Sequence, residues 1–327
     1  MSKKRDIEAA DAFADLLQIA ENATEELKAA YFEKEQRVKR KGIYTKLGEE
    51  TGLTRLEAEI LAVKDGIKFD EQNILSYAKA AQSRNSAENA RAWVHDPNWK
   101  KRKKELDDLS DTIMDVFIVL YEEELEIFRR VMRKIAKEGY SRKMYEIQQL
   151  LGYAEKVEKI TAEDIDKLME NRWRGATYSE RIWGNTQKLA QRVREELLTS
   201  FLCGAPAEQA YLAIDRVFQK GIYNARRLIR TEAAYMANIV QLEAYRRMGI
   251  KKYLYVAILD MRTSEMCREM NGRVIPVKNA APGYNFPPLH PWCRSTTRPV
   301  RPKRNDAMVE QPFKDMNYQE WLKKYMR

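Results

Sequence analysis

Hydrophobic residues recur at spacings of three and four over most of the chain before residue 250, and this pattern predicts amphipathic helices. The longest such pattern runs from Leu106 to Ile135, although the acidic run Glu122–Glu124 interrupts its apolar seam. It predicts a helix of about 30 residues, ~45 Å long, which Gly139 is expected to end. A helix of this length suits either an intramolecular bundle or an interface with another chain, and we favour the bundle.

Several shorter patterns divide the rest of the helical region. Thr161 and Asp164 predict a helix start, and Thr177 and Glu180 stand in the register of a capping box. Residues 46–68 resemble a helix–turn–helix, which would suit a DNA-binding regulator, but ordinary helical hairpins share this pattern and are favoured.

The pattern changes at residue 253. Tyr253–Leu259 is aromatic and branched, as expected of a strand. A short helix should follow, capped by Thr263 or Ser264 and closed by Asn271-Gly272. Residues 273–277, with Pro276, predict an edge strand, and residues 294–297 a last strand. This region therefore predicts a compact module of helix and strand.

These patterns predict a mainly α fold with a small α+β C-terminal module and an elongated helical N-terminal region. The expected divisions are a helical region over residues 1–100 with a connector near 83–98, a long-helix region over 101–172, a domain over 173–300 whose helices precede the α+β module 253–300, and a basic tail with a short docking helix over 301–327.

Composition limits the compartment and the partners. The 327 residues include 33% charged side chains, a net charge of +10 and three cysteines, too few for a disulfide framework. No apolar run approaches the ~18 residues that a membrane span needs, and the first residues lack an apolar signal core. We expect a protein made in a cytoplasm, with no membrane partner.

Basic residues cluster in three places: at residues 37–41, before the predicted long helix, and from Arg298 at the end of the module into the tail. Such clusters neutralise phosphates, so non-specific contact with double-stranded DNA is expected, without sequence readout. The expected DNA contacts are Lys100, Lys101, Arg102, Lys103, Lys104, Arg298, Arg301, Lys303 and Arg304.

Cys267, His290 and Cys293 are candidate metal ligands. With Asp260 as a fourth ligand they would make a zinc site, the one cofactor that the sequence suggests, although paired C-x-x-C half-sites are missing. Two alternatives stay open: two buried thiols beside a structural histidine, which we favour, and a Cys267–Cys293 disulfide.

Two charged groups are candidate anion sites. Asp260, Arg262 and Arg294 would form a catalytic or anion-binding cluster or else an ion-pair brace, and we favour the brace. Arg226 and Arg230 share one face of a predicted helix with Glu232 displaced around it. They would contact an anion or a partner, or brace the module, which we favour.

No nucleotide-binding, metalloprotease or serine-hydrolase motif is present in the sequence. Hydrolysis by a cysteine and His290 would lack an orienting partner. We therefore predict no catalytic residue and no enzyme activity. The alternative is a metal-assisted nuclease that uses the Cys/His cluster.

Two motifs in the module carry a specific resemblance. D-x-R-T-S-x-x-C-R-x-x-x-G followed by P-P-x-H-P-W-C-R-S-T-T resembles the phage Mu F-like minor head proteins, the phage head morphogenesis family. The likeness spans about residues 173–300 and includes the upstream segment Arg227–Glu232. The matching residues are Asp260, Arg262, Thr263, Ser264, Cys267, Arg268, Gly272, Pro287, Pro288, His290, Pro291, Trp292, Cys293, Arg294, Ser295, Thr296 and Thr297.

The resemblance implies a non-enzymatic minor capsid protein of a tailed phage or prophage. Such a protein would lie inside the procapsid near the portal and aid head assembly, DNA packaging or ejection, with the portal, other head proteins and packaged DNA as partners. It would be found in the virion head, and in the host cytoplasm during assembly. Many relatives carry further cysteines where Ser264 and Ser295 stand here. The structural residues of the motif would be Asp260, Arg262, Thr263, Gly272, Pro288, Pro291 and Arg294.

Overall fold

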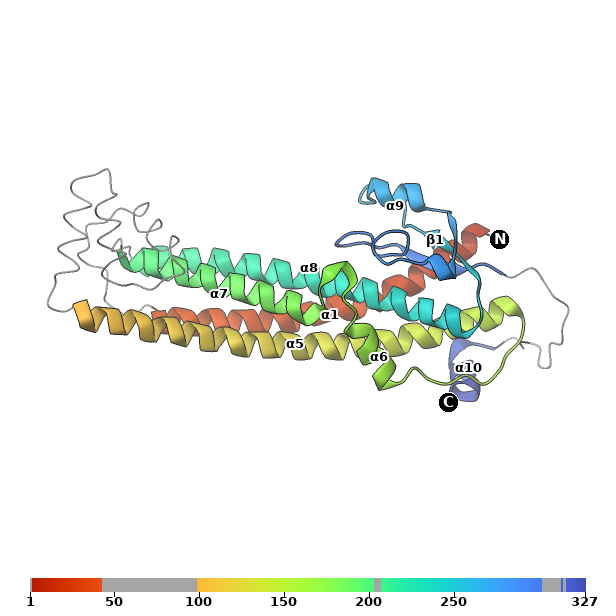
Figure 1. The fold of residues 1–327 in the computed structure, drawn as a ribbon, viewed down its shortest axis with the longest axis horizontal. Coiled ribbons are helices and arrows are strands. Elements are labelled where there is room, and N and C mark those ends of the chain that lie inside the picture. Colours follow the sequence, from red (N-terminus) through yellow and green to blue (C-terminus); the bar gives the residue numbers. More distant parts are fainter. Residues whose placement is uncertain (1, 43–98, 203–206, 302–312, 314–315) are drawn as a thin grey trace. The chain divides into compact units, whose positions relative to one another are not determined.

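The computed structural model describes residues 2–42, 99–202, 207–301, 313 and 316–327. These residues form helices and, toward the carboxyl end, one three-stranded antiparallel sheet (Figure 1). The predicted class, mainly α with a small α+β C-terminal module, is therefore confirmed. None of the described helices contains an 18-residue stretch apolar enough to cross a membrane.

Four long helices carry most of the described chain. They are α1 (Ser2–Gly42), α5 (Trp99–Leu151), α7 (Tyr178–Leu202) and α8 (Ala207–Arg247). The shorter helices are α6 (Ala162–Met169), α9 (Glu265–Met270), α10 (Tyr318–Tyr325) and the 3-10 turns η1 (Trp173–Gly175) and η2 (Val277–Asn279). The chain forms two compact units, the first made of Met1–Glu26, Leu125–Arg181 and Arg226–Arg327 and the second of Leu27–Glu124 and Ile182–Ala225.

The second unit is built from stretches of all four long helices. The rings of Phe117 in α5 and Phe218 in α8 stack with centroids 5.7 Å apart, and Tyr121 in α5 meets Trp183 in α7 edge-on at 5.1 Å. Gly221 lets α8 approach closely, since a Cβ there would lie 2.9 Å from the side chain of Leu189. Aromatic and small residues therefore set the spacing of these helices.

In the first unit, α5 continues through Gly139 to Leu151, so the predicted helix end at Gly139 is wrong. The reason is tertiary packing. A Cβ at Gly139 would lie 3.1 Å from Leu16 of α1 and 3.2 Å from Val240 of α8. The glycine lets three helices pack closely, and this packing outweighs the ~1 kcal/mol that glycine costs inside a helix.

The predicted start signals of α6 and α7 are confirmed. At α6, the Thr161 hydroxyl accepts from the backbone N–H of Asp164, whose carboxylate accepts from the N–H of Thr161. At α7, Thr177 and Glu180 make the same reciprocal pair. Each pair satisfies two N–H groups that a helix start leaves unpaired.

The sheet has the order β2-β1-β3, with β1 (Lys252–Val256) in the centre between β2 (Val274–Pro276) and β3 (Thr296–Pro299). In β1, Tyr253 lies opposite Ile275 and Pro299, and both pairings are antiparallel. Pro276 lies in an edge strand as predicted, where its missing N–H breaks no ladder bond. The first predicted strand ends earlier than expected, and the last begins two residues later.

The aromatic segment after residue 312 contains α10, which packs on α5 within the first unit. The buried Trp321 donates from Nε1 to Oε1 of Gln148 at 2.8 Å, and its ring meets that of Tyr145 at 5.6 Å. The Val157 and Arg327 backbones are also hydrogen-bonded to each other. α10 is thus part of the body of this unit.

Two predicted features lie outside the described residues: the helix–turn–helix-like pattern at 46–68 and the connector near 83–98. The domain boundaries at residues 100, 172 and 300 stay predictions.

Glu124 in the second unit is a buried carboxylate with one partner. It accepts a 2.9 Å hydrogen bond from the Tyr31 hydroxyl, while its Oε1 finds no partner among the described residues. Burial raises the pKa of Glu124 to about 7, against the lowering effect of the Tyr31 bond. Ionisation of this group therefore opposes folding.

We expect Glu124→Gln to stabilise the chain at alkaline pH. An unfolded Glu titrates near pH 4.5, so the folded wild type should lose stability between about pH 4.5 and pH 7, by about 3 kcal/mol in full. The amide cannot ionise, and its gain over wild type should appear at pH 8 and be small at pH 4. Urea unfolding at both pH values measures this. Glu122→Gln, on the exposed side of the same helix, is the matched control; an equal gain at both pH values would contradict the assignment.

Candidate functional site

Local turn chemistry positions Cys267 in the first turn of α9. The Ser264 hydroxyl caps this helix by accepting from the Cys267 backbone N–H at 3.3 Å, which satisfies an otherwise unpaired donor. Gly272, at φ +80°, follows the helix in the left-handed conformation that glycine tolerates. The thiol of Cys267 is buried as a result of this placement.

A proline-rich loop supplies the other two groups. The Cys293 N–H donates to the His290 carbonyl at 3.2 Å, so the two residues share one turn. The His290 Nδ1 lies 2.7 Å from the Pro291 carbonyl. Because a carbonyl can only accept, Nδ1 carries a proton and Nε2 is left to face Cys267.

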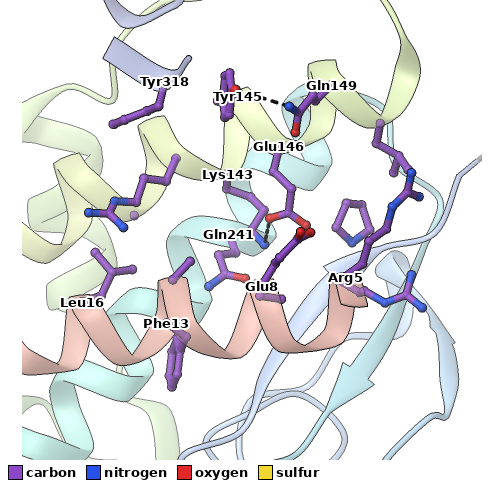
Figure 2. Close-up of a pocket in the computed structure, with 17 residues that line it drawn as sticks. Arg5, Glu8, Phe13, Leu16, Lys143, Tyr145, Glu146, Gln149, Gln241 and Tyr318 are labelled. Carbon is purple, nitrogen blue, oxygen red and sulfur yellow. Dashed lines mark hydrogen bonds and ion pairs between the residues drawn. The ribbon is translucent and has the colours of Figure 1, made fainter. Parts of the chain in front are cut away.

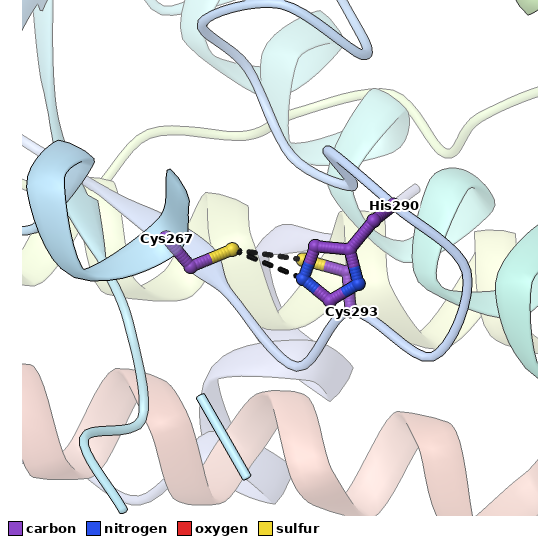
Figure 3. Close-up of side chains that lie close together, drawn as sticks. All are labelled: Cys267, His290 and Cys293. Atoms are coloured by element: carbon purple, nitrogen blue, oxygen red, sulfur yellow. Dashed lines mark hydrogen bonds between the residues drawn. The ribbon is translucent and has the colours of Figure 1, made fainter. Parts of the chain in front are cut away.

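The three side chains converge (Figure 3). The Cys267 Sγ lies 3.3 Å from Nε2 of His290 and 3.7 Å from Sγ of Cys293. All three candidate ligand atoms lie within 4.8 Å of one another. Both thiols are free, so the structure contains no Cys267–Cys293 disulfide.

The close contacts polarise the cluster. The pKa of Cys267 is lowered, chiefly by the hydrogen bond from Cys293 and also by His290. The pKa of Cys293 is raised, because its thiol donates a hydrogen bond to Cys267 and is buried. The hydrogen bond to Cys267 raises the pKa of His290. Negative charge therefore gathers on Cys267, between a thiol and an imidazole.

Two of the three spacings in the cluster are close to those of a tetrahedral metal site. Zn–S bonds of about 2.3 Å and Zn–N bonds of about 2.1 Å place sulfurs about 3.8 Å apart and sulfur and nitrogen about 3.6 Å apart. The contacts of 3.7 Å and 3.3 Å come close to these values. The hydroxyl of Ser264 lies 2.9 Å from Nε2 of His290. Three residues of this chain would hold zinc, with water or a hydroxyl completing the set.

The same cluster is also part of an apolar core. Cys267 and Cys293 pack with Tyr255, Ala257 and Leu289. The Tyr255 hydroxyl lies 3.4 Å from the Cys267 Sγ. The hollow beside the cluster measures about 10 Å³, which is about the space that one water needs. The site as it stands has no room for a substrate.

Asp260 does not join this cluster. Its carboxylate accepts two hydrogen bonds from Arg294, at 2.7 Å and 2.5 Å, and a third from the Arg262 backbone N–H at 2.8 Å. The Arg294 bonds are the main reason that the pKa of Asp260 lies well below its usual range. The exposed Arg262 guanidinium is 4.0 Å away. The geometry is that of a brace between the turn after β1 and the loop before β3.

The other residues of the sequence motif shape the same turn and loop. The Thr263 hydroxyl accepts from the Asp260 N–H at 2.9 Å and donates to the Ile258 carbonyl. Pro288 is buried, and Pro291 is exposed with its carbonyl bonded to His290.

The three charged residues of α8 that were predicted as an anion or partner site, Arg226, Arg230 and Glu232, form ion pairs within the first unit. Arg226 and Arg230 both pair with Glu21 of α1, at 3.2 Å and 2.6 Å, and Arg226 also lies over the Trp292 ring. Glu232 faces elsewhere and is bonded to Arg181 and to the Trp173 indole. The structure thus does not bring Glu232 together with the two arginines.

The predicted DNA contacts are only partly described. Lys104 is exposed on α5 and Arg301 is exposed after β3. Arg298 is paired with Asp6. The side chains of Lys100, Lys101, Arg102 and Lys103 and the whole of Lys303 and Arg304 lie outside what the structure describes.

A polar row on α8 was missed by the sequence analysis. Asn238 donates to the Ser295 carbonyl at 3.2 Å, and Gln241 donates to the Thr296 hydroxyl at 3.2 Å. One turn further, the hydroxyls of Tyr245 and Thr297 lie 3.0 Å apart. All these residues are buried. Polar residues at spacings of three and four inside an apolar helix were the signal that could have revealed this row.

Residues 184–298 match the family model described as Phage Mu protein F like protein. The match covers most of α7, all of α8 and the module to the third residue of β3. It confirms the family resemblance seen in the two motifs. No curated protein and no solved structure matches the chain.

We expect the purified full chain to bind one Zn²⁺ through Cys267, His290 and Cys293. Loading with Co²⁺ should give the thiolate-to-metal absorption that two cysteine ligands produce, and Cys267→Ser and Cys293→Ser should each weaken it strongly. Cys203→Ser is the matched control, because it removes the chain's remaining cysteine. Equal binding by all three variants would leave the cluster a purely structural core.

Proposed function

Because residues 184–298 make this chain a phage Mu F-like protein, we propose that it is a non-enzymatic minor capsid protein of a tailed phage or prophage. In this proposal it is a head morphogenesis protein that acts inside the procapsid at the portal. It aids head assembly and the packaging or ejection of DNA. It remains in the virion head after assembly in the host cytoplasm.

The observation that carries the proposal, beside the family match, is how the module uses its polar residues. Ser295, Thr296 and Thr297 are turned inward and bonded to α8. Asp260 and Arg294 are bonded to each other. The first set holds the module to α8, and the Asp260–Arg294 pair braces the module internally. Polar groups that are used up in this way are expected of a part that other proteins contact through its shape.

The rival proposal, a metal-assisted nuclease, is less well supported. A nuclease needs a cleft where a phosphodiester reaches the metal, whereas the hollow at the cluster measures about 10 Å³ and Cys267 is 2% exposed. The regulator proposal depends on residues 46–68, which lie outside the described part of the chain. The head protein is therefore the function we propose.

We expect the chain to be present in procapsids and in mature heads purified after prophage induction. Deleting its gene should lower the yield of DNA-filled heads, and re-expression from a plasmid should restore it. Mass spectrometry of gradient fractions detects the chain in the particles, and electron microscopy measures the yield of DNA-filled heads. Absence of the chain from particles at every assembly stage would refute the proposal. So would cleavage of plasmid DNA by the purified chain with Zn²⁺, Mg²⁺ or Mn²⁺ that His290→Ala abolishes.

Packaged DNA is the second partner in this proposal, through the basic clusters. The purified chain should bind two unrelated 30-base-pair duplexes equally, with affinity that falls steeply as salt rises. Replacing Lys100, Lys101, Arg102, Lys103 and Lys104 with Gln should reduce the magnitude of the salt slope by up to about 4.5, since each neutralised phosphate contributes about 0.9. Salt-insensitive binding, or a strong preference for one duplex, would contradict non-specific phosphate contact.

A further inference from the structure

A groove of about 760 Å³ runs between α5 and α10 in the first unit. Its apolar lining consists of Ile160, Tyr318, Leu322 and Met326. Ile160 and Met326 are buried, while Tyr318 and Leu322 are half-buried and reach the groove surface. We call these four residues the floor of the groove. α10, which carries two of them, is fixed to α5 because its Trp321 is fully buried and hydrogen-bonded to Gln148.

Four lysines stand around this floor: Lys134, Lys137, Lys159 and Lys323. All four are exposed, and none makes an ion pair with any described residue. The acid that lines the groove, Glu138, is bonded to Arg142 at 2.5 Å. Nearby Glu320 accepts from the Asn317 backbone N–H at 3.0 Å. Among the described residues that line the groove, four lysines therefore stand against one acid, Glu138, which already has a cation partner.

Several other cations of the same unit do have an acid partner. Arg133 pairs with Asp166 at 3.0 Å, and Arg247 pairs with Asp164 at 2.8 Å. The separate cavity of about 410 Å³ beside α1 has charges that are largely paired, since Lys143 there binds Glu146 (Figure 2). The groove is distinguished by four lysines that surround one apolar floor and make no ion pair with any described residue.

We propose that this groove binds an acidic amphipathic helix of another head protein. Lysine ammonium groups would meet carboxylates on the flanks of that helix, while its apolar face would cover the floor. The α5 side of the groove, from Lys134 to Ser141, is about two helical turns long, which suits anchors at positions i, i+3 or i+4, and i+7. DNA is the less suitable occupant, because phosphate contacts use basic groups and leave an apolar floor uncovered. The identification of the partner as a head protein rests on the proposed function. The preference for an acidic amphipathic helix rests only on the residues of the groove.

The test uses the full chain and a labelled 18-residue peptide with glutamates on one helix face and leucines on the other. Fluorescence anisotropy should show saturable binding. The groove variant Lys134→Glu, Lys137→Glu, Lys323→Glu should weaken it at least tenfold. The control Lys167→Glu, Lys251→Glu, Lys278→Glu changes the net charge equally at exposed lysines of the same unit and should bind as wild type does. Leu322→Ser, which keeps every charge, should weaken binding at least threefold, and circular dichroism checks that each variant is folded.

Several results would overturn the proposal. Equal binding by the groove variant and the control would place the peptide elsewhere. A peptide with serines in place of its leucines that binds equally well would show a charge surface only. Displacement of the peptide by a 20-base-pair duplex, with no effect of Leu322→Ser, would make the groove a nucleic-acid surface. Self-association of the wild type that the groove variant abolishes would make a second copy the occupant.

The two proposals fail in different ways. Loss of peptide binding in the groove variant, together with absence of the chain from particles, would leave the groove assignment standing and remove the head function. Suppose instead that the groove variant is found in heads at the wild-type level and binds the peptide as well as the wild type does. The head function would then stand, and the groove assignment would be removed.

Discussion

The module depends on one buried contact, the row of hydrogen bonds between α8 and the segment Ser295–Thr297. The three polar residues of this segment are 3% exposed or less, and burying such groups without partners costs about 1–3 kcal/mol for each. Asn238, Gln241 and Tyr245 supply those partners from successive turns of α8. Since both sides lose hydrogen bonds if the strand shifts, the row fixes the register of β3 against the helix.

The Cys/His cluster follows from this anchoring. Cys293 lies two residues before Ser295, so the loop that carries it is fixed at its carboxyl end by the row on α8. Between Cys293 and Ser295, Arg294 is held by Asp260 of the turn after β1. The cap of α9 by Ser264 then brings Cys267 to the loop. Three contacts, the row on α8, the Asp260–Arg294 pair and the Ser264 cap, thus bring two thiols and an imidazole within 4.8 Å of one another.

The charges of the chain serve different purposes in different places. Arg230, Arg247 and Arg294 are partly buried and paired, and such pairs specify how elements meet more than they stabilise the fold. The lysines of the α5–α10 groove are exposed and unbalanced, which leaves them available to a partner. A net charge of +10 therefore says little by itself, because its meaning depends on which cations already have an acid.

The sequence by itself determined the local structure. The helical periodicity, the Thr161 and Thr177 caps, the cap of α9 and the edge position of Pro276 each depend on a few neighbouring residues. The motifs around Cys267 and His290 carried the resemblance to the family whose model matches residues 184–298. Tertiary structure decided what depends on distant residues. Gly139 looked like a helix end and is a packing position, because Leu16 and Val240 lie against it. Asp260 was a candidate metal ligand until Arg294, 34 residues away, bonded both its oxygens. The polar row on α8 had no visible purpose before β3 lay beside it, since a buried hydrogen bond is defined by two partners and the sequence shows them only one at a time.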